Sequence, residues 1–307
     1  MSVAFAILPI FLTFVCGYVL VATKTLPTDR WEGIETLSFR FLIPVVLIKA
    51  IAGSDLSISK FGSMILALVA ALTIAGLAIL LLRRVFSHKQ LPNPAFTTLF
   101  QTTTRWNAFI ALAAAELLIG PEGFALIAVA MAVLIPLINI ANIIVLAVFG
   151  TGRATVGMIT KTVFKNPLVQ ACLIGLAINL SGVVVPQTIM QTLDLIGRSA
   201  LGVGLLAIGA GISLKRLLKI STAVWAGIIF RLGLCPALFI ALSQIANLSP
   251  TQTLAGVLVL AVPAASNGYI VAKQMGGDAD LYADILAWQT VIAMLMLPVI
   301  AIVLSVT

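Results

Sequence analysis

The sequence predicts an all-α polytopic membrane protein whose ten transmembrane helices form two inverted five-helix repeats. Three observations lead to this prediction: an apolar composition, basic residues on one alternating set of loops, and a repeat of half the chain. Hydrophobic residues make up 61% of the 307 positions and charged residues only 9%, whereas soluble domains carry about 25% charged residues. The mean hydropathy is +1.19. Such a composition indicates a chain that lies in lipid.

Apolar stretches long enough to cross a bilayer, about 20 residues each, recur along the chain. No basic segment or small-residue cleavage site precedes the first stretch, so we expect no cleaved signal peptide. The predicted spans are 3–22, 30–52, 60–82, 95–118, 124–149, 165–182, 187–213, 220–246, 251–274 and 281–304.

The basic residues predict the orientation of these spans. Of the 18 Lys and Arg residues, eleven fall in loops on one alternating side, and only Lys60 falls in a loop on the other. Because basic loops stay in the cytoplasm, we expect both termini on the extracytoplasmic side of the cytoplasmic (inner) membrane. The net charge of +8 thus reflects topology, and we expect no nucleic-acid partner. The eleven are Lys24, Arg30, Arg83, Arg84, Lys89, Arg153, Lys161, Lys165, Lys215, Arg216 and Lys219.

The second half of the chain repeats the first at displacements of 158 to 162 positions. Each repeat holds five spans, an odd number, so the second copy enters the membrane upside down, as in alternating-access transporters. We place the repeats at 1–150 and 163–307. The matching pairs are Gly17 and Gly175, Arg40 and Arg198, Gly53 and Gly211, Leu56 and Leu214, Asn107 and Asn267, and Pro136 and Pro298.

The ninth span contains a predicted helix break. Within an apolar stretch it places Pro263, Ser266, Asn267 and Gly268 close together. Proline removes a backbone donor, and the freed polar groups are tolerated at membrane depth only inside protein or beside a watery cavity. Transporters build their binding sites in this way.

The fourth span carries the matching segment, Thr102-Thr103-Thr104-Arg105-Trp106-Asn107. It lacks a proline, because Thr103 stands at the position of Pro263. Threonine hydroxyls bond nearby backbone groups, so we expect the hydroxyls to cap the freed groups of this break.

These residues resemble the auxin efflux carrier family of bacteria, which is related to the plant PIN auxin carriers. The resemblance covers nearly the whole chain and is most specific at Pro263…Ser266-Asn267-Gly268, at Ala272-Lys273-Gln274-Met275-Gly276-Gly277-Asp278 and at Phe41-Leu42-Ile43-Pro44. It implies the fold of the bile acid/sodium symporters. In that fold a scaffold (here 1–55 and 163–214) stands beside a transport domain (60–150 and 219–307), in which spans 4 and 9 cross at unwound centres.

The resemblance also implies a substrate class and a site. Bacterial relatives are mostly assigned small organic anions such as malate or malonate, and the plant relatives export auxin. Asn107 and Asn267 match the crossover asparagines. The bile-acid branch uses an acidic crossover residue for sodium, and this chain has none there, which argues against sodium coupling. Family members often dimerise through the scaffold, so a homodimer within membrane lipid is expected.

The candidate substrate-binding residues lie at the two breaks. Asn107 and Asn267 either cap half-helix ends or present amides to a carboxylate beside the positive end of a half-helix. Arg105 is our best candidate for an anion contact, because an intramembrane arginine costs at least ~2.5 kcal/mol and its planar fork suits a carboxylate. The remaining candidates are Thr104, Pro263, Ser266 and Gly268.

Other charged residues have two readings. Glu116 and Lys273, near the ends of spans 4 and 9, either snorkel to the interface or act as a proton site and a tethered charge that stands in for a coupling cation. Asp284 is a candidate partner for Lys273. For the charged residues within the other helices we expect anchoring or interhelical bonds; these are Arg40, Lys49, Arg198 and Arg231.

The sequence predicts a carrier and not an enzyme. It contains no arrangement of Ser, His and Asp within the membrane and no phosphate-binding loop of the GxxxxGK[ST] type, and we expect neither a cofactor nor a metal. The predicted function is secondary active transport of small organic anions by an elevator-type shift, as an exporter or a proton-linked carrier. The alternatives are a sodium-coupled symporter of amphipathic organic acids and a non-transporting anion sensor.

Overall fold

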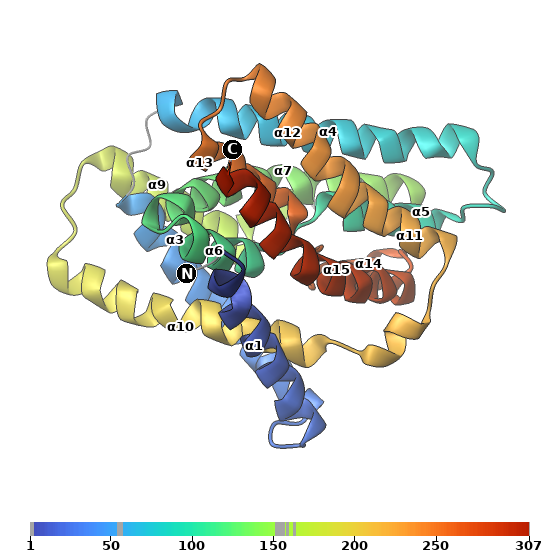
Figure 1. Cartoon of the computed structure of the whole chain (residues 1–307), viewed down its shortest axis with the longest axis horizontal. Coiled ribbons are helices and arrows are strands. Elements are labelled where there is room, and N and C mark those ends of the chain that lie inside the picture. Colours follow the sequence, from blue (N-terminus) through green and yellow to red (C-terminus); the bar gives the residue numbers. More distant parts are fainter. Residues whose placement is uncertain (1–2, 54–57, 151–156, 158–159, 162–163, 307) are drawn as a thin grey trace. The chain divides into compact units, whose positions relative to one another are not determined.

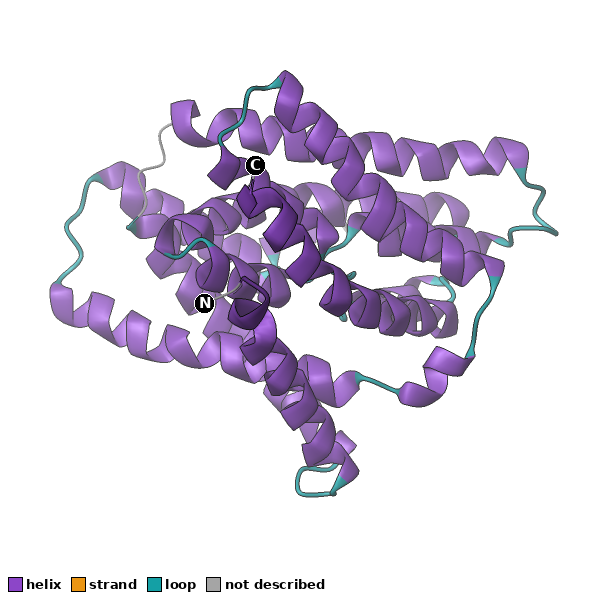
Figure 2. Cartoon of the chain, viewed as in Figure 1, coloured by secondary structure: helices purple, strands orange, loops and turns teal. Residues whose placement is uncertain are grey.

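The computed structural model describes residues 3–53, 58–150, 157, 160–161 and 164–306. Within these ranges every regular element is a helix and none is a strand (Figure 2), which confirms the all-α prediction. Arg153, assigned above to a cytoplasmic loop, and Leu56 of the repeat lie outside the described residues.

Helices of membrane-spanning length confirm a multi-pass membrane protein. Among the described residues, five helical stretches are long and apolar enough to cross a bilayer. The helices in the other predicted spans are shorter or interrupted. The five stretches are Phe61–Val85, Pro121–Phe149, Gln187–Gly211, Thr222–Ile245 and Ala279–Val303.

The chain forms two compact units, which we describe separately. Unit 1 comprises Met1–Phe61, Phe109–Pro136 and Lys161–Ile212. In it α1 (Val3–Ala22) packs along α10 (Gln187–Gly211), and α3 (Ile43–Ala52) packs along α9 (Pro167–Ser181) (Figure 1). The other elements of unit 1 are η1 (Thr28–Arg30), α2 (Trp31–Leu37), the π-helical turn η2 (Ser38–Leu42), α6 (Ala108–Leu118) and the first half of α7 (Pro121–Phe149).

Glycine permits the close packing of α1 against α10. A Cβ at Gly17 would meet the main-chain oxygen of Leu206, and a Cβ at Gly209 would meet that of Phe14. Small residues let helix backbones approach in lipid, where van der Waals contact replaces the hydrophobic effect between helices. Gly209 belongs to the glycine-rich stretch 201–211, and this contact gives it a packing role.

Unit 2 comprises Gly62–Ala108, Leu137–Thr160 and Ser213–Thr307. Its apolar core joins helices from both halves of the sequence, through buried residues such as Phe96, Ile228 and Ile285. Its elements are α4 (Ile58–Val85), α5 (Asn93–Thr104), the second half of α7, the 3-10 turn η3 (Leu214–Leu218), α11 (Thr222–Ile228), the π-helical turn η4 (Ile229–Leu234), α12 (Cys235–Ile245), α13 (Pro250–Ala261), α14 (Gly268–Met275) and α15 (Ala279–Val306).

Both π-helical turns come just before a proline. η2 ends two residues before Pro44 and η4 ends two residues before Pro236. A proline ring clashes with the carbonyl four residues earlier, and a wider turn relieves such a clash. Arg231 lies inside η4, so this local widening helps to set the direction of its side chain.

Candidate functional site

Two helices of unit 2 stop in the middle of predicted spans. α5 ends at Thr104 and α6 begins at Ala108; α13 ends at Ala261 and α14 begins at Gly268 (Figure 1). Both expected breaks are therefore present. We call residues 105–107 the first break and residues 262–267 the second break. Val262 is extended (φ −84°, ψ 155°), as the residue before a proline tends to be.

The two breaks lie against each other. The main-chain N–H of Asn107 donates to the carbonyl of Pro263 at 2.8 Å. The bond pairs one backbone group freed in the first break with one freed in the second. Buried backbone groups require such partners. The chain segments meet although 156 positions separate these two residues in the sequence.

Arg231 holds both breaks from η4. Its side chain is 0% exposed and donates to three backbone carbonyls: Nη1 to Thr103 at 3.2 Å, Nη2 to Val259 at 2.7 Å, and Nε to Val262 at 2.9 Å. These oxygens belong to the last turns of α5 and α13 and to the start of the second break. Arg231 therefore makes interhelical bonds, one of the two roles expected for it, and not an anchor at the membrane surface; its acceptors are oxygens that the breaks free.

Gln289 of α15 makes a second connection between the breaks. Its Oε1 accepts from the N–H of Ala264 at 2.9 Å, and its Nε2 donates to the carbonyls of Thr102 at 3.2 Å and Gly227 at 2.8 Å. The side chain is 0% exposed. One amide thus satisfies one backbone group in the last turn of α5 and one in the second break.

The threonine hydroxyls of the first break do not cap it, so that expectation was wrong. Thr102 and Thr104 donate back to the carbonyls of Thr98 and Phe100 within α5. Among the described residues, the Thr103 hydroxyl has no hydrogen-bond partner. A helical threonine reaches the carbonyl four residues earlier, and that carbonyl is not one of those freed at the break. Thr104 also bonds Asn142, which assigns its hydroxyl an internal role.

Arg105 begins the first break in an extended conformation (φ −72°, ψ 149°), as expected. Its side chain is 5% exposed. Nε donates to Oε1 of Gln101 at 3.3 Å and Nη1 donates to Oδ1 of Asn139 at 3.0 Å. Within the described part of the chain, no carboxylate forms an ion pair with Arg105. The break therefore contains a buried positive charge that only neutral groups contact.

In the second break, Asn267 precedes α14 but does not cap it. Its side chain makes no capping hydrogen bond, and its Oδ1 is buried without a partner among the described residues. Because a 180° turn of the amide exchanges Oδ1 and Nδ2, this position offers a ligand either an acceptor or a donor. Ser266 is exposed and Asn107 is buried.

Gly268 permits a close contact with Tyr282 of α15. A Cβ at Gly268 would overlap the Tyr282 hydroxyl, and this hydroxyl donates to the carbonyl of Ala265 at 2.6 Å. The glycine thus allows Tyr282 to support the second break from the side of α15. We had predicted Gly268 as a substrate-binding residue; the structure assigns it this contact with Tyr282.

The charge-compensation candidates are not gathered at the breaks. Lys273 is exposed on α14, and Asp284 pairs with Arg216 at 2.7 Å instead of with Lys273. Arg216 also pairs with Asp280 at 3.1 Å. Since Asp280 and Asp284 lie one turn apart on α15, one guanidinium fork reaches both. These two carboxylates, Asp284 above all, raise the pKa of Arg216 above its usual value.

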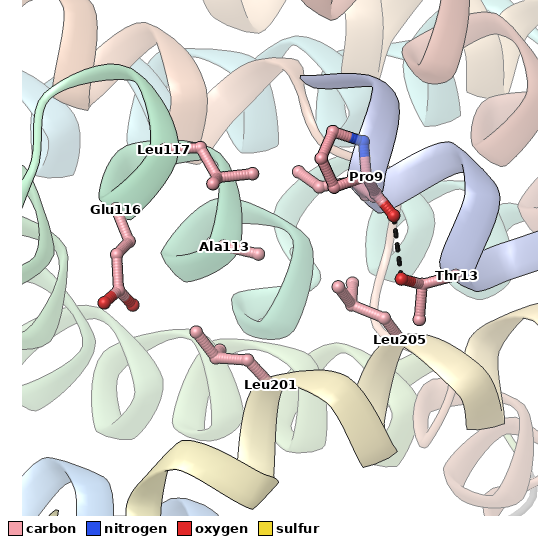
Figure 3. Close-up of a pocket in the computed structure, with 8 residues that line it drawn as sticks. Pro9, Thr13, Ala113, Glu116, Leu117, Leu201 and Leu205 are labelled. Atoms are coloured by element: carbon pink, nitrogen blue, oxygen red, sulfur yellow. Dashed lines mark hydrogen bonds between the residues drawn. The ribbon is translucent and has the colours of Figure 1, made fainter. Parts of the chain in front are cut away.

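Glu116 lies in unit 1, at a cavity of about 270 Å³ between α1, α6 and α10 (Figure 3). Pro9, Leu117 and Leu201 contribute apolar walls. The Thr13 hydroxyl on this wall donates to the carbonyl of Pro9 at 2.7 Å. Glu116 forms no ion pair with any described residue, and it is exposed, so snorkelling and a proton site both remain open for it.

Two other charged residues of unit 1, Lys49 and Arg198, form a cluster with Asp194. Lys49 of α3 pairs with Asp194 of α10, and Asp194 pairs with Arg198 at 2.7 Å. Lys49 thus forms the interhelical bond expected for it. The bond of Arg198 lies within α10 and was not predicted, and Arg40 is exposed.

Sequence reasoning missed the partners of Arg105. It also missed Gln289 and the backbone partners of Arg231, the two side chains that connect the breaks. Gln101, Asn139 and Gln289 carry no motif, and an amide in an apolar span is too common a feature to single out. Arg231 had a signal, because a charged residue in the middle of a span is costly and usually faces the protein interior. Its position within 220–246, 11 residues after the start and 15 before the end, favoured that interpretation.

Interrupted helices that meet around a buried cation are typical of membrane transporters. The family model described as "Membrane transport protein" matches residues 125–301. This match covers more than half of the chain, and the chain belongs to this family of auxin efflux carrier-type transporters. It is a family of transporters and not of enzymes. No curated protein matches the chain.

Proposed function

We propose that this protein is a secondary carrier of small organic anions and that the anion binds where the two breaks meet. Arg105 supplies the positive charge, and Asn107 and Asn267 supply amides. Ser266 lies at the exposed part of the second break. The function rests on the family, and the substrate class rests on the site.

The observation that carries the proposal is the environment of Arg105. A buried charge is expensive unless something pairs with it, and described residues offer this guanidinium only two neutral acceptors. An anionic ligand would complete the pairing, and the planar fork of arginine matches the two oxygens of a carboxylate. The N-terminus of α14, which follows Asn267, adds a partial positive charge.

The sequence repeat supports an alternating-access mechanism. Two inverted repeats of five spans, each with a broken helix, would give the two sides of the membrane equivalent access routes. We assign the scaffold role to 1–55 and 163–214 and the moving role to 60–150 and 219–307, with an elevator-type shift. The loops that carry most of the basic residues support a cytoplasmic position for those loops. Both termini then lie on the extracytoplasmic side of the inner membrane.

The driving force follows from the charge of the substrate. Export of an anion from a negative-inside cell is favoured by about 2.3 kcal/mol per charge per 100 mV, so export requires no coupling ion. Uptake would require a cation, and Glu116 is the candidate proton site. The breaks contain no acidic residue, which weakens sodium coupling.

The test is uptake of labelled malonate, malate and indole-3-acetate into proteoliposomes, with and without sodium and a pH gradient. We expect at least one acid to move without sodium. Asn267→Ala is expected to abolish this movement, and Gln244→Ala, which truncates an exposed amide at the end of α12, is expected to leave it unchanged.

The other outcomes separate the alternatives. Transport that stops without sodium would favour the symporter of amphipathic acids. Thermal stabilisation by one acid without any movement would favour the anion sensor. Movement that is equal in the wild type and Asn267→Ala would place the site away from the second break.

A further inference from the structure

A pair of hydrogen-bond donors at the end of α5 lacks an acceptor. Gln101 is 0% exposed, and its Nε2 is buried without a partner among the described residues. Arg105 lies one turn further along, and no described residue accepts a hydrogen bond from its Nη2. Buried donors are nearly always paired in native structures, so Nε2 of Gln101 requires an acceptor, whereas Nη2 of Arg105 retains some exposure.

The direction of the Gln101 amide is set by Arg105. Oε1 accepts from Nε of the guanidinium at 3.3 Å, and a guanidinium is never an acceptor. Oε1 must therefore face Arg105, which turns Nε2 away from that bond. The amide cannot exchange its ends without placing two donors against each other.

The rest of the guanidinium is also held. Nη1 donates to Oδ1 of Asn139 on α7 at 3.0 Å, so contacts from two helices fix the orientation of the Arg105 fork. The backbone N–H of Arg105 still bonds the carbonyl of Gln101 at 2.9 Å, which keeps the two residues on one helical turn. Residues four apart on a helix share a face.

From this arrangement we infer that Gln101 is a second anion-binding residue, whose Nε2 joins Nη2 of Arg105 to receive one carboxylate group. This inference rests on the proposed function and adds a residue and a ligand group to it. Two donors on neighbouring planar groups suit the two oxygens of a carboxylate. Gln101 thus both positions the arginine and contacts the anion.

The test uses the purified full chain and malonate as the probe. Gln101→Glu places a carboxylate beside Arg105, where it supplies from within the protein the acceptor that we assign to the ligand. We expect the unfolding temperature without malonate to equal or exceed that of the wild type, and the stabilisation by malonate to disappear. In proteoliposomes the KM for malonate should rise at least about tenfold, the effect of losing one hydrogen bond to a charged group.

Two further variants complete the experiment. Gln101→Met removes the donor without adding charge, and it should raise the KM by about tenfold even if Gln101→Glu fails to fold. Gln244→Glu makes the same chemical change at an exposed position and should behave as the wild type does. A purely structural role for Gln101 predicts that both substitutions lower the unfolding temperature and leave the KM unchanged.

The outcomes distinguish this inference from the proposed function. If wild-type protein responds to malonate and both Gln101 variants keep the wild-type KM, the donor pair does not bind the anion and only this inference is wrong. If the wild type is neither stabilised by nor transports malonate, malate or indole-3-acetate, the anion-carrier function and the donor pair fall together.

Discussion

The two breaks of unit 2 differ in length although they occupy matching places in the repeat. The first has three residues and the second has six. A displacement of 160 maps Ala261, where α13 ends, onto Gln101, yet α5 continues to Thr104. Proline disfavours helical geometry in the residue before it, and Thr103 imposes no such limit. The missing proline therefore changes where the helix ends and does not prevent the break.

This difference keeps Gln101 and Arg105 together. Because α5 continues through residues 102–104, Gln101 lies inside the helix and Arg105 directly follows the end of the helix. At the second break the corresponding segment is already extended, and backbone groups there are bonded by Arg231, Gln289 and Asn107. The first break therefore presents charged and amide donors, whereas the second has a largely satisfied backbone and one amide oxygen, that of Asn267, without a described partner.

The largest effect is expected for Arg231→Leu. It removes a hydrogen bond from each of three buried carbonyls, of which that of Thr103 keeps only the weak thiol donor of Cys235. At about 1–3 kcal/mol each, we expect the loss of at least ~3 kcal/mol and little folded protein. Size-exclusion chromatography and thermal unfolding in detergent measure this. Arg198→Leu removes an arginine whose side chain is 78% exposed and should fold normally. Normal folding of Arg231→Leu would show that the breaks do not need the three hydrogen bonds of Arg231.

Arg105→Gln should separate binding from folding. The variant keeps an amide that can bond Gln101 and Asn139 but removes the charge, so we expect a similar unfolding temperature and a loss of about hundredfold in kcat/KM for the transported acid. Arg84→Gln, at an exposed position, is the matched control. A wild-type kcat/KM in Arg105→Gln would mean that the buried charge does not contact the anion.

Thr103→Pro tests the comparison of the breaks directly. Proline removes a backbone donor from the last turn of α5, so the helix should end near Gln101, as α13 ends before Pro263. We expect up to ~3 kcal/mol of destabilisation and a KM at least about tenfold higher, because Gln101 and Arg105 no longer share a turn. Thr103→Val keeps the helix and removes only a hydroxyl without a described partner. Equal KM values in both variants would contradict the argument.

The smallest effect is expected for Gly268→Ala. The added Cβ overlaps the Tyr282 hydroxyl, and such overpacking costs about 1–3 kcal/mol. Combining it with Tyr282→Ala removes the hydroxyl and the two ring carbons that the added Cβ would overlap, so the double variant should lose less stability than the sum of the single ones. Gly202→Ala meets nothing within 4 Å and serves as the control. Strict additivity in thermal unfolding would exclude the contact.

Much of the fold follows from the sequence, because apolar length and Pro or Gly placement are local signals. The helix breaks near Asn107 and Asn267, with Arg105 in the first of them, were predicted and are present. The backbone partners of Arg231 were not predicted. Arg231 and Thr103 are 128 positions apart, and no pattern in either segment indicates that the two segments are in contact. The predicted partner of Asp284 was wrong for the same reason, since proximity in sequence favoured Lys273 over Arg216.

Arg105 and Arg231 have an electrical consequence. A guanidinium keeps its proton under physiological conditions, so unit 2 holds two buried positive charges where the breaks meet. If unit 2 crosses part of the field during transport, the membrane potential acts on the unloaded protein at about 2.3 kcal/mol per charge per 100 mV. Each bound negative charge cancels part of that force, so the loaded and empty forms would differ in how strongly voltage drives them.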